Sequence, residues 1–333
     1  MDKIKTDYKF ISIKERDLKN VSNFLKDLGD QNAIHLNPAL KFLKWKYQYN
    51  YFAKNTAFLK AIKTKNKIVG ICGYLPFKLV TPLGIKKSIW GMDILFDKEA
   101  IKHPFVMLQA WNNEAKNLQK SGVSHSLTFP STKVLFENWQ KLGFISVDFY
   151  SFECRLGRKV DGGRPVDIFV KSLKKFNEKV DILFARISKQ YDFIAVKSSE
   201  YLNWRYKDHP YNRYKIFGAF DKQNKMQAYI IARKDSRDDC GYILDILGDL
   251  ESPQYSYAVI LKALAYFKKQ SCYKVQIALS HREYMQIFKK FGFYPFRKEF
   301  CLYLNDLKSF KKTVYKNKKW HITMGDGDFR GGK

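Results

Sequence analysis

The stretch GMDILFDKEAIKHPFVMLQAWNNEAKNLQKSGVSHSLTFPSTKVLFENWQKLGF, residues 91–144, decides the fold. Its first apolar run encloses Asp93, and the polar residues that follow end at Pro104, which suits the first turn of a helix. Apolar residues then recur at helical spacing as far as Gly122. A second apolar run and a second helix follow, and Gly143 ends that helix. The pattern predicts strand, loop, helix, strand and helix, with the loop directing a helix N-terminus beyond the strand ends.

Composition and charge bound the class of protein. The 333 residues, 45% hydrophobic and 16% aromatic, suffice for two packed domains. Because 61 Lys and Arg face 32 Asp and Glu, the formal charge of +29 suits nucleic acid, an acidic membrane surface, or a polyphosphate cofactor or acidic substrate. Lysine is spread along the chain, however, and this distribution favours a solvated lysine-rich surface.

The expected location is the cytoplasm. No run approaches the roughly 18 apolar residues that a membrane helix needs, and residues 1–10 lack the apolar core of a signal peptide. The five cysteines are odd in number and have no CxxC spacing, a pattern typical of buried thiols.

Ahead of the deciding stretch, the sequence predicts a strand, two helices and a hairpin. Alternation over residues 8–15 indicates the strand, and the helical period of residues 18–28 indicates a helix that Gly29 ends. Asn37 is the expected N-cap of the second helix, and residues 57–80 indicate a β-hairpin.

A linker separates two parts of the chain. Glycine, charge and proline concentrate in residues 157–165, and a helix-like spacing of Phe169, Leu173 and Phe176 follows. We therefore expect a first domain over residues 1–157, a linker and helix over 158–180, a second domain over 181–305, and a basic tail with a GDGD ending over 306–333.

The two halves repeat one another. Three short blocks of the first half recur in the second half in the same order, which is the signature of an internal repeat. Each half thus predicts a helix with Trp and Tyr, a hairpin, an Asp-bearing strand, a long helix, a strand and a helix closed by Gly-Phe. The blocks are KWKY at 44–47 and NWRY at 203–206, MDIL at 92–95 and LDIL at 244–247, and WQKLGF at 139–144 and FKKFGF at 288–293.

This order of elements resembles the GNAT superfamily of acyl-CoA-dependent N-acyltransferases, specifically its tandem members. The TrpArgTyr-x-x-His-Pro segment at 204–210 and the PheProSer turn at 129–131 look like bacterial members encoded with surface-polysaccharide genes. The resemblance covers residues 8–305. It implies an α/β fold (α+β mixed) of two tandem GNAT-like domains, each a mixed, largely antiparallel sheet flanked by helices.

The resemblance also implies a site. In that family the central strand splays from its neighbour and offers backbone groups to the pantetheine arm of acyl-CoA, while the next loop and helix start hold the pyrophosphate. Asp245 matches Asp93 in the repeat, so a shared structural role stays open for both. By resemblance, the cofactor-binding residues are Ile94, Leu95, Phe96, Lys98, Lys102, His103 and Phe105; the candidate catalytic bases are Asp93 and His125; and the aromatic or basic groups that line the substrate cleft, or pack the core, are Trp45, Tyr47, Trp204, Arg205, Tyr206 and Phe129.

The sequence departs from the family pattern in two places. The loop at residues 97–104 has no glycine, and the positions that usually hold a proton-donating tyrosine are Trp139 and Phe288. The corresponding loop of the second half, residues 248–255, is acidic. The first half is therefore the expected acyl-CoA-binding domain.

The function expected from these features is transfer of an acyl group, acetyl first of all, from acyl-CoA to an amine by direct attack in a ternary complex. The acceptor would be a small-molecule amine such as an amino sugar of surface-polysaccharide synthesis. One alternative is a catalytically degenerate scaffold that acts as an interaction module. Another is a tRNA-dependent aminoacyl transferase or other nucleic-acid-binding protein, which the charge permits.

The tail adds two expectations. Asp326 and Asp328 are two carboxylates without further ligands, so no metal is expected there. The tail resembles the endings of the same polysaccharide-linked proteins, which implies that it folds back near the cleft.

Overall fold

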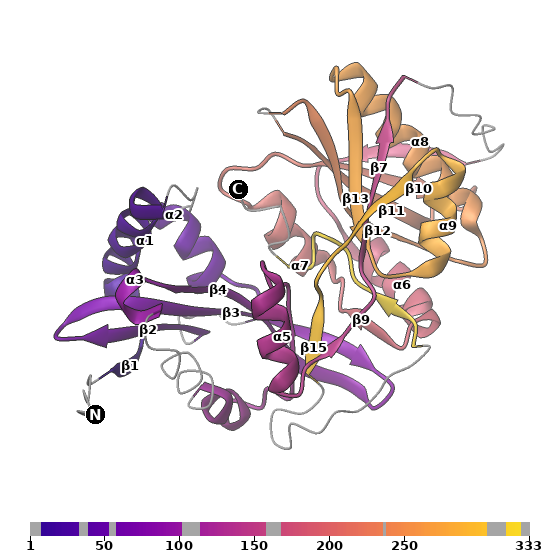
Figure 1. Ribbon diagram of the computed structural model, residues 1–333. Coiled ribbons are helices and arrows are strands. Elements are labelled where there is room, and N and C mark those ends of the chain that lie inside the picture. The colour runs from indigo at the N-terminus through magenta and orange to yellow at the C-terminus, as the bar shows by residue number, and fades with distance from the viewer. Residues whose placement is uncertain are drawn as a thin grey trace.

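The computed structural model describes residues 8–32, 39–52, 58–101, 114–157, 168–235, 238–304 and 318–327. It contains two mixed β-sheets with helices packed against them, one built mainly from the first half of the chain and one mainly from the second (Figure 1). The expected class, an α/β fold with two units of mixed sheet, is confirmed.

The first sheet is organised around a long hairpin. Its strands, in spatial order, are β1 (Lys9–Ser12), β2 (Leu59–Thr64), β3 (Lys67–Thr81), β4 (Gly84–Phe96), β5 (His125–Thr128), β15 (Leu302–Leu304) and β6 (Ile145–Ser146), while β9 (Phe193–Ala195) pairs with β3 and β16 (Trp320–His321) pairs with β9. Lys65 and Asn66 adopt φ values of 46° and 67°, which lets the chain turn tightly between β2 and β3. The predicted hairpin is thus present, and β4 pairs in parallel with β5, as the deciding stretch predicts.

The second sheet repeats this arrangement. Its strands, in spatial order, are β14 (Tyr294–Lys298), β7 (Tyr150–Arg155), β13 (Lys274–Leu279), β12 (Cys240–Gly248), β11 (Met226–Lys234), β10 (Lys215–Phe220) and β8 (Phe169–Leu173). The β10–β11 hairpin feeds the central strand β12, which pairs in parallel with β13.

Each sheet contains strands from the other half of the chain: β7 in the second sheet, and β9, β15 and β16 in the first. β7 follows β6 in the sequence, yet it lies between β13 and β14 in the second sheet. β15 follows β14 in the sequence, yet it lies between β5 and β6 in the first sheet. In Figure 1, the pink β7 stands among orange strands and the orange β15 lies beside α5 (Lys133–Lys141). Sheet membership thus crosses the boundaries expected at residues 157 and 305.

One element differs from the expectation. The spacing of Phe169 and Leu173 predicts a helix, but these residues bound strand β8, which pairs with β10. A run of five residues is too short for periodicity to separate the two structures. Antiparallel pairing with β10, from Ile216–Leu173 to Phe220–Phe169, decides in favour of the strand.

The helices follow the predicted pattern with one shift. The first helix continues past Gly29 to Asn32, because its buried face packs against the sheet and offsets the roughly 1 kcal/mol that a mid-helix glycine costs. The helix starts predicted at Asn37 and Pro104 lie outside the described residues. The helices are α1 (Leu18–Asn32), α2 (Leu40–Leu43), α3 (Lys98–Ile101), α5, α6 (Glu178–Ile187), α7 (Ser199–Leu202), α8 (Pro253–Lys269) and α9 (Arg282–Lys290), with residues 114–120 also helical.

A matched pair of π-helical turns joins the two halves. Lys44–Gln48 continues α2, and Asn203–Lys207 continues α7, so each turn carries one copy of the repeated Trp-x-Tyr block. Trp45 and Trp204 stack at 5.0 Å, and each indole Nε1 donates to the backbone carbonyl of the other, at 3.0 and 3.2 Å. This reciprocal contact supports the alignment of the repeat and buries both indoles between the halves.

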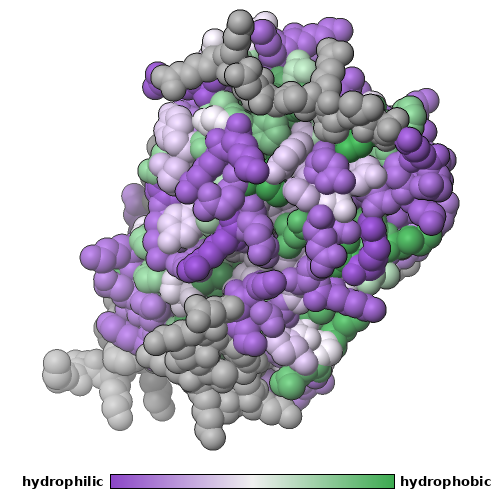
Figure 2. Space-filling view, turned by 90° about the vertical axis from the view of Figure 1, so that its right-hand side faces the viewer, coloured by the Kyte–Doolittle hydropathy of each residue, from purple (hydrophilic) through white to green (hydrophobic). Residues whose placement is uncertain are grey.

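The burial of the cysteines and the polar character of the surface agree with the amino-acid composition. All five cysteines are free and buried, as their spacing predicts. On the face shown in Figure 2, hydrophilic residues are spread widely and interleaved with hydrophobic ones. Among the residues that the structure describes, no helix is long and apolar enough to cross a membrane.

Candidate active site

A β-bulge interrupts the central strand of each sheet beside its aspartate. The register between β3 and β4 shifts between Ile71 and Gly73, opposite Asp93, whose φ is 43°. Aspartate tolerates this left-handed conformation better than most residues. The register between β11 and β12 shifts at Ile231, the partner of Asp245. The two bulges bend the central strands at equivalent positions of the repeat.

Just before the first bulge, β4 separates from its parallel neighbour β5. The two strands pair only as far as Gly91 and Thr128, although β4 runs on to Phe96. We call residues 92–96 the first splay. Among the described residues, no segment pairs with this edge of β4 on the side of β5. Within the described residues, this side of the first splay is thus a free sheet edge.

The second half has the corresponding feature, but there it is filled. β12 pairs with β13 only as far as Ile243 and Ile277 and then continues to Gly248. We call residues 244–248 the second splay. The C-terminal segment at residues 320–327 lies between β12 and β13 at this point. The second splay thus has a protein occupant.

Asp93 is held by two donors from the first π-helical turn. The Nζ atom of Lys46 lies 2.7 Å from the Asp93 carboxylate, and the Tyr47 hydroxyl donates to the same oxygen. The Lys46 side chain is 1% exposed, whereas Asp93 is 29% exposed. Gly73 makes room for this contact, because a Cβ there would lie 1.9 Å from the Tyr47 hydroxyl. Asp93 is therefore fixed in direction and still accessible.

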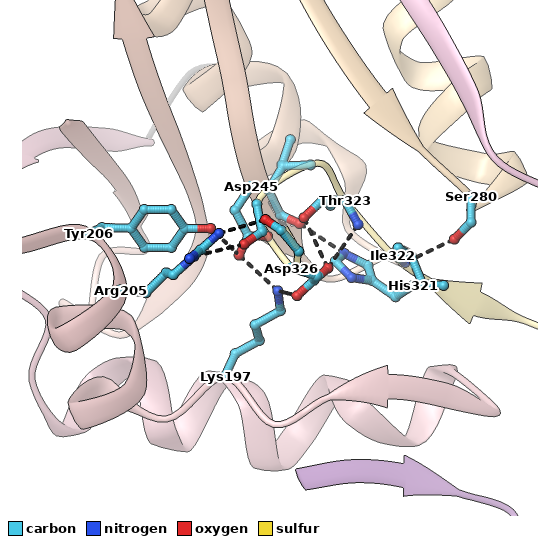
Figure 3. Close-up of polar contacts among 12 residues, drawn as sticks. Lys197, Arg205, Tyr206, Asp245, Ser280, His321, Ile322, Thr323 and Asp326 are labelled. Atoms are coloured by element: carbon cyan, nitrogen blue, oxygen red, sulfur yellow. Dashed lines mark hydrogen bonds and ion pairs between the residues drawn. The ribbon is translucent and has the colours of Figure 1, made fainter. Parts of the chain in front are cut away.

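Asp245 has similar partners but no access to solvent. The Nζ atom of Lys197 lies 2.9 Å from its carboxylate, and the hydroxyls of Tyr206 and Tyr229 lie 3.4 and 3.5 Å away (Figure 3). The ammonium of Lys197 also contacts Asp326 of the C-terminal segment, and all three charged side chains are at most 1% exposed.

The buried charges perturb one another. Burial raises the pKa of Asp245 to about 6, against the opposing effect of Lys197. Burial acts in the same direction on Asp326, but the charges of Lys197 and His321 outweigh it and hold the pKa of Asp326 below its usual value. For Lys197, burial is outweighed by the two carboxylates, so its pKa lies above the ordinary value. The cluster is thus held together as an ion pair with one carboxylate in excess.

Replacing His321 by glutamine is expected to flatten the acid side of the stability profile. Burial lowers the pKa of His321 to about 4, and the charge of Lys197 adds to the effect. The unfolded chain takes up this proton near pH 6.5, before the folded chain does, so the contribution is present above about pH 6.5 and is lost as the pH falls towards 4. Glutamine cannot titrate, and its amide can still donate to Ile246.

Urea unfolding between pH 4 and 8 measures this difference. The acid slope of the free energy of unfolding should be smaller in the variant by up to about 1.4 kcal/mol per pH unit. Part of the slope should remain, because burial also lowers the pKa of His281 to about 4. An unchanged slope would show that the His321 ring titrates normally in the folded chain.

The structure places the predicted cofactor residues along and just after the first splay. Ile94 and Leu95 are half-buried, and Phe96 is buried against Gly70. Asp97 caps α3 through a bond from the Ala100 amide at 2.8 Å, and the exposed Lys98 follows it. The other three predicted residues, Lys102, His103 and Phe105, lie outside the described residues.

The two candidate bases are not brought together. His125 is buried at the start of β5, opposite Ser88, and its Nδ1 atom lies 2.7 Å from the Ser124 hydroxyl. Asp93 lies five residues beyond Ser88 on β4, about 16 Å along the strand at 3.3 Å per residue. Of the two, only Asp93 lies in the first splay.

The predicted cleft residues divide into four groups, of which Phe129 is the last. Trp45 and Trp204 pack against each other between the halves, and Tyr47 and Tyr206 contact the two bulge aspartates. Arg205 donates to backbone carbonyls of the C-terminal segment.

Phe129 lies where the first splay begins. It directly follows Thr128, the last paired residue of β5, and it stacks on Trp90 at 4.8 Å and Phe149 at 5.1 Å. Aromatic rings therefore close the inner end of the splay. The indole Nε1 atom of Trp90 is buried and has no hydrogen-bond partner within the described part of the chain.

Three residues of these clusters escaped sequence reasoning. Lys46 lies inside the repeated block, but only its second-half counterpart, Arg205, is predicted as a cleft residue. Lys197 and Tyr229 lie outside every repeated block, and nothing in their neighbourhood signals a buried charge cluster. The repeat itself could have pointed to Tyr47 and Tyr206 as partners of the aspartates, because both blocks recur together.

Two cavities lie elsewhere. One of about 250 Å³ separates α1 from the β2–β3 turn and reaches Asp97. The other, of about 690 Å³, lies where the C-terminal segment enters the second half, beside Lys319 and the start of α9. Neither includes Asp93, so we assign the site from the strand geometry and charge contacts. Within the described residues, no group of three or more His, Cys, Asp or Glu side chains could hold a metal ion.

Comparison with known proteins supports the architecture. No protein-family model matches the chain. No curated protein matches it either.

Three solved structures are similar over most of the chain. A GCN5-related N-acetyltransferase from Anabaena variabilis has a TM-score of 0.69 at 12% identity, with 90% of this chain and 72% of that chain covered. A tandem GNAT protein from the clavulanic acid biosynthesis pathway has a TM-score of 0.60 at 10% identity, with 89% and 98% covered. Saccharomyces cerevisiae N-myristoyltransferase, solved with bound myristoyl-CoA and inhibitors, has a TM-score of 0.61 at 12% identity, with 91% and 80% covered.

These likenesses agree with the internal repeat and with the two equivalent bulged strands. At such low identity they bear on the fold rather than on the chemistry. The chain is a tandem protein of the GNAT fold.

Proposed function

We propose that this protein is an acyl-CoA-dependent N-acyltransferase whose working site is the first splay. The observation that carries the proposal is the contrast between the halves. In the second half the C-terminal segment fills the splay and Asp245 is sealed from solvent, whereas in the first half no described segment pairs along the splay and Asp93 is 29% exposed.

The residues of the first splay fit an extended amide-containing arm. The edge of β4 at residues 92–96 offers backbone groups that no described strand uses on that side. The exposed Lys98 stands at the open end, where a phosphate would be stabilised by its charge. At the inner end, the buried Nε1 of Trp90 has no hydrogen-bond partner among the described residues, so a carbonyl oxygen that reached it would satisfy this donor.

Acyl-CoA would supply an acyl thioester, and this chain would supply position and a proton acceptor. Asp93 is placed at the bulge to accept the proton that an attacking amine loses, while Lys46 and Tyr47 hold its carboxylate in one direction. The inner end is closed by Phe129 and Trp90, which favours a short acyl group such as acetyl.

The proposed acceptor is a small-molecule amine. The class favoured by the sequence resemblance is an amino sugar of surface-polysaccharide synthesis. The proposed location is the cytoplasm, which the buried free thiols support.

Reversing the charge of Lys98 tests the cofactor assignment. Lys98→Glu is expected to weaken acetyl-CoA binding at least about tenfold, because it replaces an attractive charge near the polyphosphate by a repulsive one. Titration calorimetry at fixed salt measures the change. Lys78→Glu is the matched control, because Lys78 is an exposed lysine of β3 near the far end of the hairpin.

The two variants should have the same unfolding midpoint. Equal weakening in both would show that only the overall charge matters. No binding of acetyl-CoA by the unmodified chain at millimolar concentration would remove the transferase proposal and leave the interaction-module alternative.

A further inference from the structure

The C-terminal segment lies between β12 and β13 of the second sheet and bridges them through backbone hydrogen bonds. On one side the Gly325 amide donates to the Leu244 carbonyl at 2.8 Å. On the other side the Met324 amide donates to the Ala278 carbonyl at 3.1 Å, and the Ser280 amide donates to the Ile322 carbonyl at 3.0 Å. The segment therefore uses backbone groups of both strands where β12 and β13 have parted.

Two side chains from outside the segment hold it in place. Arg205 donates to the carbonyls of Gly325 and Gly327 at 3.1 and 2.6 Å, and Lys197 contacts Asp326 (Figure 3). The other Asp326 oxygen accepts from the Thr323 amide and hydroxyl, which closes a turn. All residues from 320 to 327 are buried, so the segment is part of the core.

The fit depends on a glycine. A Cβ at Gly325 would lie 2.1 Å from the Tyr206 hydroxyl and 2.7 Å from the Leu244 carbonyl oxygen. Leu244 is the second-half counterpart of Met92, which lies in the first splay. The segment thus occupies, in the second half, the backbone position that the proposed function leaves to a ligand in the first.

The segment also reaches the first half. A Cβ at Gly327 would lie 2.6 Å from the Phe129 ring and 3.5 Å from the Trp90 ring. These are the rings that close the inner end of the first splay. Gly327 therefore packs against the rings that close the first splay, while the preceding residues of the segment occupy the second splay.

We propose that residues 320–327 are a built-in occupant of the second splay, so that the chain holds one acyl-CoA, in its first half, although it contains the fold twice. The stoichiometric part rests on the proposed function. Admitting a ligand to the second splay would require removal of the segment, which would break its backbone pairing and leave Lys197 and Asp245 without Asp326.

Two measurements on the full chain test the proposal. Titration calorimetry with acetyl-CoA is expected to give one molecule bound per chain. Hydrogen exchange followed by mass spectrometry is expected to show residues 320–327 protected to the same degree as β12. Binding of two molecules per chain, or rapid exchange of this segment in the unmodified protein, would overturn the proposal.

A glycine substitution adds a directed test. Gly325→Val is expected to speed exchange of residues 320–327 at least about tenfold, because the new side chain collides with Tyr206 and the β12 backbone. Gly157→Val is the matched control, because a Cβ at Gly157 meets no atom within 4 Å, and it should leave the exchange unchanged. If the valine variant does not fold, Arg205→Gln is the milder change, since it removes the two bonds to the segment's carbonyls.

The outcomes separate this proposal from the proposed function. A protected segment with no acetyl-CoA bound at all would defeat the transferase proposal and still support the built-in occupant. A segment whose exchange is the same in Gly325→Val and in the unmodified chain would defeat the occupant, whatever the stoichiometry.

Discussion

Replacement of Lys197 by methionine is expected to lower the free energy of unfolding by about 3–5 kcal/mol. The ammonium of Lys197 lies between the carboxylates of Asp245 and Asp326, and all three side chains are at most 1% exposed. Methionine fills a similar volume, but it leaves two buried carboxylates without a counter-ion. Either both carboxylates stay ionised, at a high desolvation cost, or one of them takes up a proton and becomes neutral.

The loss should depend on pH. In the variant, the pKa values of the two carboxylates would be higher in the folded chain than in the unfolded chain. The folded variant is therefore more stable at low pH and loses stability as the pH rises. The loss is therefore expected to be larger at pH 8 than at pH 5. Urea unfolding at both pH values measures it, and adding Asp326→Asn to the variant should restore part of the stability.

An exposed ion pair provides the control. Lys298 lies 3.0 Å from Asp148, and both side chains are 58% exposed. Lys298→Met should therefore change the free energy of unfolding by no more than about 1 kcal/mol. If Lys197→Met costs no more than this control, the buried cluster contributes little and the C-terminal segment is held by its backbone bonds alone.

Replacement of Asp93 by asparagine is expected to lower kcat at least about 100-fold without changing acetyl-CoA affinity. An amide keeps the shape of the side chain but cannot accept the proton of the attacking amine, and general-base catalysis typically contributes 10²–10⁴-fold. Affinity should persist, because the proposed contacts to the ligand come from the backbone of the first splay. Steady-state kinetics with an amine acceptor, together with calorimetry, separates the two effects.

The repeat supplies the control for this variant. Asp245 occupies the same position in the second bulge and also contacts a lysine and a tyrosine, but the C-terminal segment seals it. Asp245→Asn should therefore lower stability and leave kcat within a few-fold of the unmodified value. If both variants reduce kcat equally, Asp93 has the structural role that the repeat first suggested for it.

The sequence predicts much of this architecture because the repeated blocks carry local information. The Asp-bearing strand, its parallel partner and the closing Gly-Phe helix are each set by short-range patterns, and they occur in both sheets. The hairpin between β2 and β3 is predicted for the same reason, since its turn residues and alternation are local.

What the sequence does not predict is pairing between distant segments. Residues 150–155 alternate as a strand should, but the pattern is equally compatible with either sheet, and only the three-dimensional contacts place β7 beside β13. Strand β8 is missed because its pairing with β10 outweighs its local period. Lys197 and Asp326 are far apart in sequence, so no spacing argument links them.

The site was predictable only in part. Asp93 lies at the bulge and the predicted residues 94–96 follow it on β4, whereas His125 lies at the opposite end of the β4–β5 pairing; their roles in a site stay predictions. The resemblance implies that the tail folds back near the cleft, but its basic composition and GDGD motif do not indicate that residues 320–327 are buried in the second splay. The contact made by residues 320–327 thus adds a second difference between the halves to the acidic loop at residues 248–255.

The reciprocal exchange of β7 and β15 means that neither half is a self-sufficient folding unit. A fragment of residues 1–157 would keep β7 but lack β15. The position between β5 and β6 would then have no strand, and the backbone donors and acceptors of both neighbours would be unpaired. The complementary fragment would have the same defect between β13 and β14. The two lobes are therefore interlocked, and the chain should melt in one cooperative step instead of domain by domain.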